Sequence, residues 1–224
     1  MIRHISFDLW LTLIKSNPLF KKRRAELIAD TYNPKGLNIS QIEILIKRKD
    51  KIFDRYNEMK GTKIPAKEMY LNILTDLGSV PRNVAADHAE RLTRQANELF
   101  IEYPPLLLND NIPHILNQLN SENKILNIGS NTGFVEGQTL RKALMKLNVF
   151  HLFSFCVFSD EVKTSKPSPL FFQQIYDNIH VSKNQVLHIG DNPKTDYRGA
   201  VRFGFDALLI TDTNYTLNDI KTKL

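Results

Sequence analysis

Short apolar runs, each followed by a polar turn, recur along this chain. A short predicted strand, residues 2–7, comes first and runs straight into Asp8. Three later runs cover residues 124–129, 153–159 and 186–189. Continuous apolar runs of this length are typical of strands buried on both faces of a parallel sheet. Residues 134–147 instead repeat apolar side chains at helical spacing. The sequence therefore predicts an α/β fold, with a Rossmann-like parallel sheet and helices on both faces.

A long insertion with helical periodicity separates the first run from the others. Its expected helices cover residues 17–31, a stretch that begins at Ser40, residues 66–77 and residues 84–100. Ser40 and Glu43 match a capping box, and Pro104-Pro105 marks the end of the insertion. We therefore expect residues 1–14 and 106–224 to form a core and residues 15–105 an all-helical cap. Such a cap would lie over the strand ends, where its closure would expel water.

Asp8 is the first candidate for chemistry because it lies at the tip of a buried strand. Thr12 follows four residues later and offers a hydroxyl. A carboxylate placed in this way can attack an electrophile and form a covalent intermediate if its negative charge is restrained. Trp10 stands between the two, where a second carboxylate would serve in proton transfer, and its side chain cannot take that role.

The turns after the next two strands carry further polar groups. Ser130 and Asn131 precede the predicted helix, where a hydroxyl and backbone N–H groups suit a phosphate or a carboxylate. Lys166 precedes Ser168 and Pro169, which are suited to the N-cap and first position of a helix. Lys166 should therefore be held on a stiff turn.

The last of the four turns is acidic. Asp191 and Asp196 stand on either side of Pro193, a residue that can open a helix. Together with Asp8 they could hold a hard cation through oxygen ligands. His188, in the preceding strand, is expected to be a core histidine satisfied by hydrogen bonds.

In this order the four segments resemble the haloacid dehalogenase-like hydrolase superfamily, and within it the phosphatases with a helical cap of the C1 type. The shared pattern is Asp8 with Thr12, then Ser130, then Lys166 in a Lys-Pro turn, then Gly190-Asp191-Asn192 followed by Asp196. The match covers residues 1–14 and about 106–212, and it implies that residues 15–105 are the family's helical cap.

The resemblance implies a role for each group around a bound phosphate. Asp8 would be the nucleophile, and Lys166 would neutralise the transferring group. The residues that would bind this group, together with Lys166, are Thr12, Ser130 and Asn131. A phosphate dianion repels an attacking carboxylate, so positive charge is needed before Asp8 can approach.

The resemblance also implies a Mg²⁺ site. Its ligands would be Asp8, Asp191 and the backbone carbonyl of Trp10, and Asp196 would orient metal-bound water or Lys166. This set is sufficient because Mg²⁺ usually keeps several waters.

The expected activity is Mg²⁺-dependent hydrolysis of a small phosphorylated metabolite through an aspartyl-phosphate, weakened because Trp10 replaces the usual second Asp. Two alternatives stay open. One is a metal-independent 2-haloacid dehalogenase, a branch in which position 10 is commonly aromatic. In those enzymes a Tyr would stand where this chain has Phe172, and a Ser/Asn-type loop would replace Gly190-Asp191-Asn192. The other is a catalytically impaired protein that binds a phosphorylated ligand.

The composition agrees with the predicted fold but does not distinguish between the possible activities. With 224 residues and 42% hydrophobic content, the chain can bury a full core and a smaller second unit. The single Cys156 excludes an internal disulfide and suits a reducing compartment. The start leaves no space for a signal peptide, and no apolar run approaches the roughly 20 residues of a membrane span. We expect a cytoplasmic monomer or homodimer without a membrane partner.

The positive charge is concentrated in the insertion. Residues 15–108 hold 17 Lys+Arg and 12 Asp+Glu, which would attract an anionic substrate, although a solvated helix surface explains the same count. The basic run at residues 21–24 lacks interleaved aromatics, so no nucleic-acid partner is expected. Lys63, in a loop between two predicted helices, is either a substrate contact or a solvent-exposed loop residue.

Overall fold

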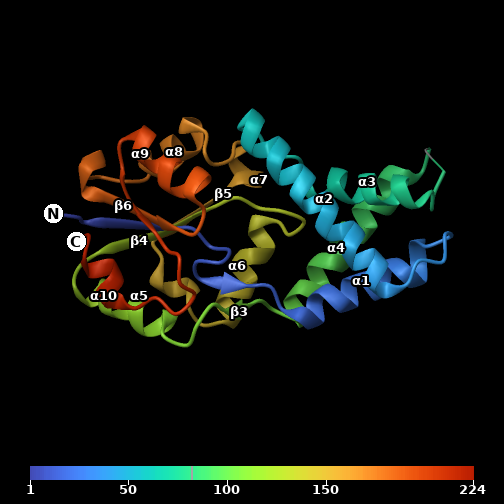
Figure 1. Ribbon diagram of the computed structural model, residues 1–224, viewed down its shortest axis with the longest axis horizontal. Helices are drawn as coiled ribbons and strands as arrows, with labels where there is room; N and C mark the ends of the chain where they lie inside the picture. The colour runs from blue at the N-terminus through green and yellow to red at the C-terminus, as the bar shows by residue number, and fades with distance from the viewer. Residues whose placement is uncertain (82) are drawn as a thin grey trace.

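A five-stranded parallel sheet lies at the centre of the computed structural model, which describes residues 1–81 and 83–224 (Figure 1). Its strands are β1 (His4–Phe7), β4 (Ile125–Ser130), β5 (Phe155–Phe158), β6 (Val186–Gly190) and β7 (Asp206–Leu209). The order is β5-β4-β1-β6-β7, and every neighbouring pair is parallel. Because β1 is central, the residue after it lies between the ends of β4 and β6. The predicted α/β fold with a parallel sheet is confirmed.

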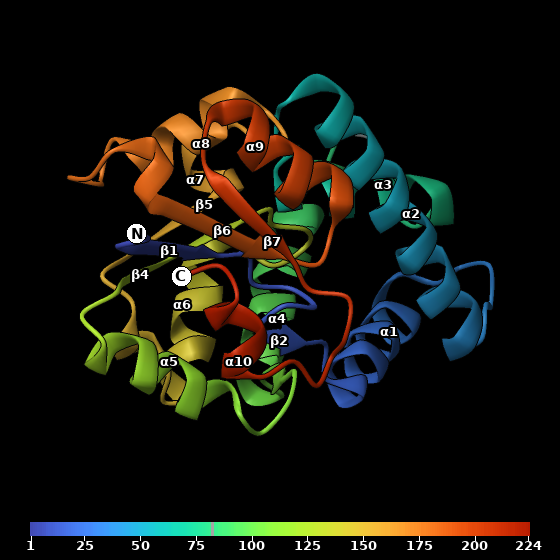
Figure 2. The same cartoon turned by 60° about the vertical axis from the view of Figure 1, so that its left-hand side comes forward.

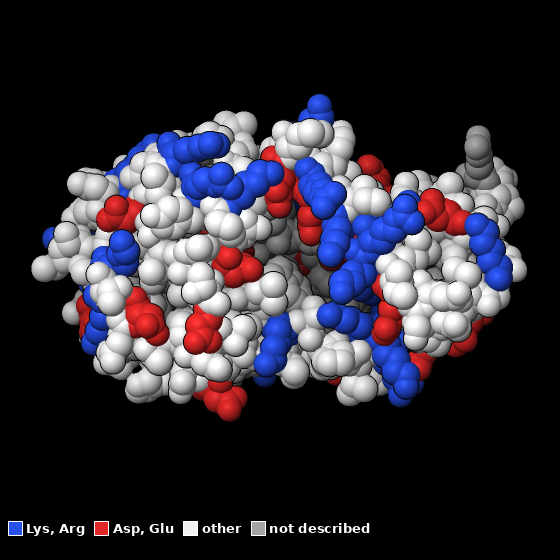
Figure 3. Space-filling view, viewed as in Figure 1, with Lys and Arg blue, Asp and Glu red and all other residues white. Residues whose placement is uncertain are grey.

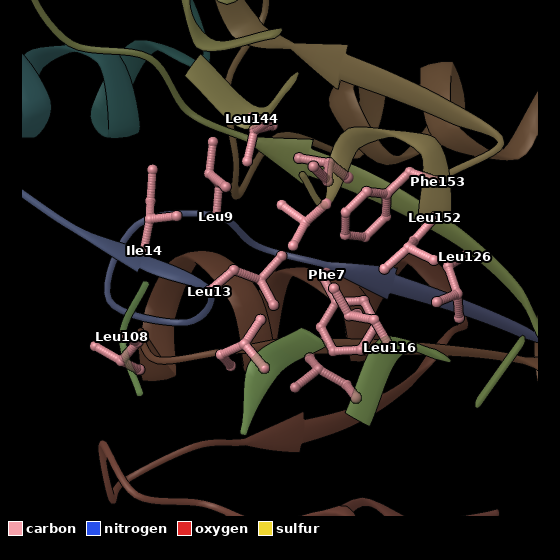
Figure 4. Packing of buried hydrophobic residues seen from close by; sticks show 14 of the residues in the cluster. Phe7, Leu9, Leu13, Ile14, Leu108, Leu116, Leu126, Leu144, Leu152 and Phe153 are labelled. Atoms are coloured by element: carbon pink, nitrogen blue, oxygen red, sulfur yellow. The ribbon is translucent and has the colours of Figure 1, made fainter. Parts of the chain in front are cut away.

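Helices cover both faces of this sheet (Figure 2). On one face lie α5 (Ile112–Ser121), α6 (Gly137–Lys146) and α10 (Leu217–Lys221). On the other lie α8 (Pro169–Tyr176) and α9 (Gly199–Phe203), and the short α7 (Ser159–Val162) follows β5. Phe7 of β1 packs with Leu116, Leu126 and Phe153 on the first face (Figure 4). Phe171 and Ala200 belong to a separate apolar cluster on the second face. The sheet is therefore buried on both sides.

The insertion forms four helices, which we call the helical unit. They are α1 (Pro18–Tyr32), α2 (Ile39–Lys60), α3 (Ala66–Leu77) and α4 (Ala85–Glu102). Ile42, Tyr70 and Leu92 are buried in an apolar cluster of this unit. Where the chain enters and leaves the unit, β2 (Ile14–Lys15) pairs antiparallel with β3 (Leu106–Leu107). None of the described helices has a stretch long and apolar enough to cross a lipid bilayer.

The prediction that Ser40 caps the second helix is wrong. The N-cap is Asn38, whose side chain accepts from the Gln41 backbone N–H at 3.0 Å, while Gln41 Oε1 accepts from the Asn38 N–H at 2.9 Å. Asn-x-x-Gln offers the same reciprocal bonds as the expected pair. Starting the helix earlier also packs Ile39 against the apolar cluster of the helical unit.

The helix expected from residue 134 begins at Gly137 instead. Phe134 leaves the core and inserts into the helical unit, 4.8 Å from the Tyr70 ring and 6.3 Å from the Phe53 ring between centroids. The Asp160 carboxylate accepts from the Gly137 N–H at 3.1 and 3.2 Å and fixes the later start. Residues 131–136 therefore serve as a connector between the sheet and the helical unit.

Candidate active site

The carboxyl ends of the parallel strands converge on a cleft of about 840 Å³ beneath the helical unit. Asp8 follows β1, Asn131 follows β4 and Asp191 follows β6, and all three line the cleft. In open parallel sheets, ligands bind outside the carboxyl ends of the strands. Figure 3 shows the molecule hollowed between the sheet-bearing part and the helical unit, with Lys and Arg along the hollow.

Lys166 joins two carboxylates at the floor of the cleft. Its Nζ lies 2.7 Å from Asp8 Oδ1 and 2.6 Å from Asp196 Oδ1. The three residues are 1%, 6% and 2% exposed, respectively, so these ion pairs are shielded from solvent. The Ser168 side chain accepts from the Leu170 N–H, and Pro169 is the first residue of α8, as predicted. The lysine is thus held by a capped helix start and by two buried charges.

Three acids line the floor of the cleft, Asp8, Asp191 and Asp196, and their pKa values differ because their partners differ. Burial raises the pKa of Asp8 to about 7, with Lys166 opposing and Asp196 adding to the rise. Burial and the charge of Asp196 raise the pKa of Asp191 to about 6. Burial acts in the same direction on Asp196, but Lys166 and His188 outweigh it and hold the pKa of Asp196 below its usual value. The metal-free site therefore disfavours the ionised forms of Asp8 and Asp191, and their negative charge is compensated only in part.

This donor set fits a hard divalent cation. Asp8, Asp191 and Asp196 each offer a carboxylate oxygen, and these oxygens lie within 4.8 Å of one another. Asp196 also accepts from the Asn192 N–H at 3.0 Å and pairs with Lys166 and His188, so its charge is the best compensated of the three. Asp8 and Asp191 retain the uncompensated charge, and oxygen ligands are those that Mg²⁺ prefers.

The groups expected to bind phosphate lie around Asp8. Thr12 Oγ1 donates to Asp8 Oδ2 at 3.3 Å, and Ser130, fully buried, donates to the Asn131 carbonyl at 3.1 Å. The Asn131 side chain is engaged elsewhere: its Oδ1 accepts from the Lys166 N–H at 2.8 Å and its Nδ2 donates to the Lys166 carbonyl at 3.0 Å. The Asn131 amide therefore positions the lysine.

Trp10 lies at the edge of the cleft. Its half-buried indole packs edge-to-face against Phe100 of α4, with ring centroids 6.2 Å apart, so it fills space under the helical unit as expected. Leu11, next to it, has a φ of +57° and an exposed side chain. A left-handed leucine costs roughly 1–2 kcal/mol, a strain typical of functional turns.

His188 is a core histidine, as expected, and for Lys63 the structure excludes one of the two alternatives. His188 is fully buried, and its Nδ1 and Nε2 lie 3.1 Å from Ser6 Oγ and 3.4 Å from Asp196 Oδ1. Lys63 is only 8% exposed and lines the cleft, so the prediction of a solvent-exposed loop residue is wrong. Its loop is buried because the Gly61 carbonyl accepts from Thr164 Oγ1 at 2.8 Å, just before Lys166.

Two acids of the cleft escaped the sequence prediction. Asp50 and Asp54 of α2 line its wall beside Glu58, at a spacing of four residues. Like charges at this spacing destabilise an isolated helix, so the pattern itself was a usable signal of a functional face.

Comparison with known proteins agrees with this geometry. A family model described as haloacid dehalogenase-like hydrolase matches residues 5–210. Glyceraldehyde 3-phosphate phosphatase of Methanopyrus kandleri is 31% identical over 72 residues, which are 32% of this chain and 31% of that protein. Phosphoserine phosphatase of Thermus thermophilus is 33% identical over 70 residues, 31% of this chain and 28% of that protein. The matched segments thus span about a third of either relative.

Solved structures share the fold over nearly the whole chain. The hydrolase YfnB of Bacillus subtilis, described bound to magnesium, has a TM-score of 0.72 at 19% identity, covering 93% of this chain and 88% of its own. A 2-haloacid dehalogenase of Pseudomonas syringae has a TM-score of 0.65 at 18% identity, with coverage of 96% and 89%. At these identities the likeness extends to the fold alone.

Proposed function

The chain belongs to the haloacid dehalogenase-like hydrolase family, and on that premise we propose that it is a Mg²⁺-dependent phosphatase of a small phosphorylated metabolite. The observation that carries the proposal is the buried Asp8–Lys166 ion pair of 2.7 Å beside the clustered oxygens of Asp191 and Asp196. The phosphatases among the curated relatives support the same reaction class.

In the proposed reaction Asp8 attacks phosphorus as the P–O bond to the leaving group breaks, and the departing alkoxide takes a proton from water. Water then hydrolyses the resulting aspartyl-phosphate, which releases phosphate and regenerates Asp8. Lys166 neutralises the transferring group, and Asp196 holds the lysine in place. Thr12, in the turn after β1, and Ser130, at the end of β4, bind phosphoryl oxygens. Bound by Asp8, Asp191 and the Trp10 carbonyl, Mg²⁺ would supply the positive charge that a phosphate dianion requires.

The helical unit acts as the cap in this proposal. Its α2 end already rests on the Lys166 turn, where Ser165 Oγ donates to the Asn57 carbonyl at 3.1 Å. Lys194 Nζ lies 2.8 Å from Glu58 Oε2 and adds a second contact to the same helix. A closed cap excludes water and strengthens electrostatic interactions at the site. The lone Cys156 supports a cytoplasmic location.

A 2-haloacid dehalogenase is the second candidate, favoured by the aromatic residue at position 10. The acidic cluster argues against it, because a metal-independent reaction has no use for the uncompensated charge of Asp191. Phe172 is fully buried and packs edge-on against His188, 5.4 Å between centroids, outside the residues that line the cleft.

The decisive experiment assays phosphate monoesters and 2-haloacids with and without Mg²⁺, on wild type and Asp8→Asn. We expect phosphate release that requires Mg²⁺ and is abolished in Asp8→Asn, since the amide is nearly isosteric but a poor nucleophile. Asp110→Asn, in the loop before α5 and outside the cleft, is the matched control and should keep full activity. Metal-independent halide release would establish the dehalogenase instead. Phosphatase activity retained by folded Asp8→Asn would exclude the proposed nucleophile.

A further inference from the structure

The helical unit contributes a wall of mixed charge to the cleft. Asp50 and Asp54 of α2, Arg24 of α1 and Lys63 of the loop after α2 all line it. Within residues 1–81 and 83–224, none of these four side chains has an oppositely charged group within 4.0 Å. Two acids and two bases thus face one cavity without pairing with each other.

Lys63 is a buried cation without a close counter-charge. Its Nζ donates to the Ile64 carbonyl and to Met69 Sδ at 3.3 Å, both neutral acceptors. Burial lowers the pKa of Lys63 to about 8, and the acids at longer range, Asp160 first, offset this only in part. An anion bound here would supply the missing charge at a position already shielded from water.

Arg24 contacts two aromatic rings beside the same cavity. Its guanidinium lies 4.8 Å from the Phe20 ring centroid and 5.4 Å from the Phe134 ring centroid. Its Nε is buried and has no hydrogen-bond partner among the described residues. Contacts of a guanidinium with aromatic rings restrict its motion, so it then binds a carboxylate at low entropic cost.

Asp50 lies next to the turn that would hold the phosphate. A Cβ placed on Gly133 would lie 3.1 Å from Asp50 Oδ1, so the carboxylate rests against the segment that follows Ser130 and Asn131. Burial raises the pKa of Asp50, with Arg24 and Lys63 opposing. Asp54 is one helical turn further along the same wall, and a cation between the two acids would be stabilised by both.

We propose that this wall recognises a zwitterionic end of the substrate, an ammonium by Asp50 and Asp54 and a carboxylate by Lys63 and Arg24, as in an O-phosphorylated amino acid. The inference rests on the proposed phosphatase function, because it places the phosphate at Asp8 and the remaining groups beneath α2. A substrate end with only negative charge would be repelled by Asp50, and a neutral one would leave all four charges without partners.

The test uses four phosphate monoesters that differ in one charged group at a time. O-phosphoserine carries both groups, phosphoethanolamine lacks the carboxylate, 3-phosphoglycerate has a hydroxyl in place of the ammonium, and glycerol 3-phosphate has neither. We expect kcat/KM for O-phosphoserine to exceed each of the others by about tenfold or more, as one charge-assisted hydrogen bond provides.

Two variants assign the groups. Lys63→Met should lower kcat/KM by about tenfold for the two carboxylates and leave phosphoethanolamine and glycerol 3-phosphate unchanged, because one charged contact is lost. Asp50→Asn should lower it for the two ammonium substrates only. Lys60→Met, exposed at the end of α2 and outside the cleft, is the matched control and should change none of the four. Thermal unfolding establishes that each variant is folded, and Asp54→Asn replaces Asp50→Asn if that variant does not fold.

The outcomes separate this inference from the proposed function. Equal kcat/KM for all four substrates, or variants that slow all four alike, would overturn the zwitterion subsite and leave the phosphatase standing. If wild type hydrolyses none of them, the phosphatase proposal fails for these esters, and calorimetric binding of the same four compounds decides the subsite. Selective binding of O-phosphoserine that Lys63→Met removes would support it; equal binding of all four would overturn it.

Discussion

Trp10 is the residue that departs furthest from what phosphoryl transfer requires. The indole N–H is a donor that does not titrate, so it can neither protonate a leaving oxygen nor activate water. General acid/base assistance contributes about 10²- to 10⁴-fold to a rate. Among the remaining groups, Asp8 supplies the attack, Lys166 neutralises negative charge, and the clustered acids would hold the metal. None of these roles includes transfer of a proton to the leaving group. On this basis the enzyme should be slow with substrates whose leaving groups need a proton.

Restoring a carboxylate at position 10 should therefore raise phosphatase turnover. We expect Trp10→Asp to increase kcat by about tenfold or more at saturating Mg²⁺, a fraction of the usual assistance. Trp10→Asn is the control, because it removes the same indole and has the same size as Asp but cannot transfer a proton. Losing the contact with Phe100 destabilises both variants equally, so their difference isolates proton transfer. A folded Trp10→Asp enzyme no faster than Trp10→Asn would show that proton transfer does not limit this site.

The acids around Lys166 predict how Mg²⁺ and pH act on stability. The folded-state pKa values of Asp8 and Asp191, about 7 and about 6, lie above the ordinary value of 3.8, so over this window the folded state binds more protons than the unfolded chain. The contribution of these two acids to the stability of the metal-free protein should then fall as pH rises from 4 to 7, and the raised pKa of Asp54 acts in the same direction. The lowered pKa values of buried His4 and His188 act in the opposite direction below about pH 6.5. The lowered pKa of Asp196 acts only below this window, and the raised pKa of Lys166 only above it.

Thermal unfolding measured across this pH range, with EDTA or with Mg²⁺, checks the prediction. Bound Mg²⁺ compensates the same negative charge, so the melting temperature should be higher and its decline with pH smaller. Relative to wild type, Asp191→Asn should reduce the loss of stability with rising pH in the metal-free protein and should lose the Mg²⁺ response. Superimposable curves with and without Mg²⁺ would contradict a metal site at these residues.

At the scale of single elements, the start of α2 distinguishes what the sequence predicts from what the structure adopts. Asn38→Ala removes the side-chain cap on the Gln41 N–H and should cost about 0.5–2 kcal/mol of unfolding free energy. Ser40→Ala, inside the helix and exposed, should be neutral or slightly stabilising because alanine has the higher helix propensity. Urea denaturation of both variants measures the difference. A larger loss for Ser40→Ala would place the cap where the sequence pattern alone suggested it.

The elements that could be predicted are those whose pattern is local. An apolar run ending in Asp8 or Asp191 specifies a buried strand and a polar tip, and the parallel order brings such tips together. The burial of Lys63 has no local signal, because it depends on the Gly61 carbonyl meeting Thr164, about 100 residues away in the chain. The late start of α6 likewise depends on Phe134 packing into another part of the fold. Site residues on strand ends were therefore accessible to sequence reasoning. On the wall of the helical unit, the four-residue spacing of Asp50 and Asp54 was a local signal, whereas the burial of Lys63 had none.

At the scale of the whole molecule, the excess of positive charge should matter through its placement. The formal net charge is +6, and Lys and Arg follow the hollow between the two parts of the protein (Figure 3). Lys21, Lys47 and Lys51 line the cleft from the helical unit. A basic cleft raises the local concentration of an anionic substrate, whereas the same charges on an outer helix surface would only keep the protein in solution. These two explanations of the same composition differ in their dependence on salt.

If the cleft lysines attract the substrate, kcat/KM for a phosphate dianion should fall severalfold as NaCl rises from about 0.02 to 0.3 M. Over that range the Debye length, the distance over which charges interact in solution, shortens to less than about 10 Å. The value of kcat should change little, because Lys166 is buried and screened much less. Lys47→Glu with Lys51→Glu should lower kcat/KM at low salt and remove most of its salt dependence. Arg91→Glu with Arg94→Glu makes the same change in net charge on exposed positions of α4 outside the cleft, and should leave both nearly intact. Equal losses of kcat/KM in the two double variants would mean that net charge alone acts. No loss in either would mean that the basic helices are a solvated surface without a role in attracting substrate.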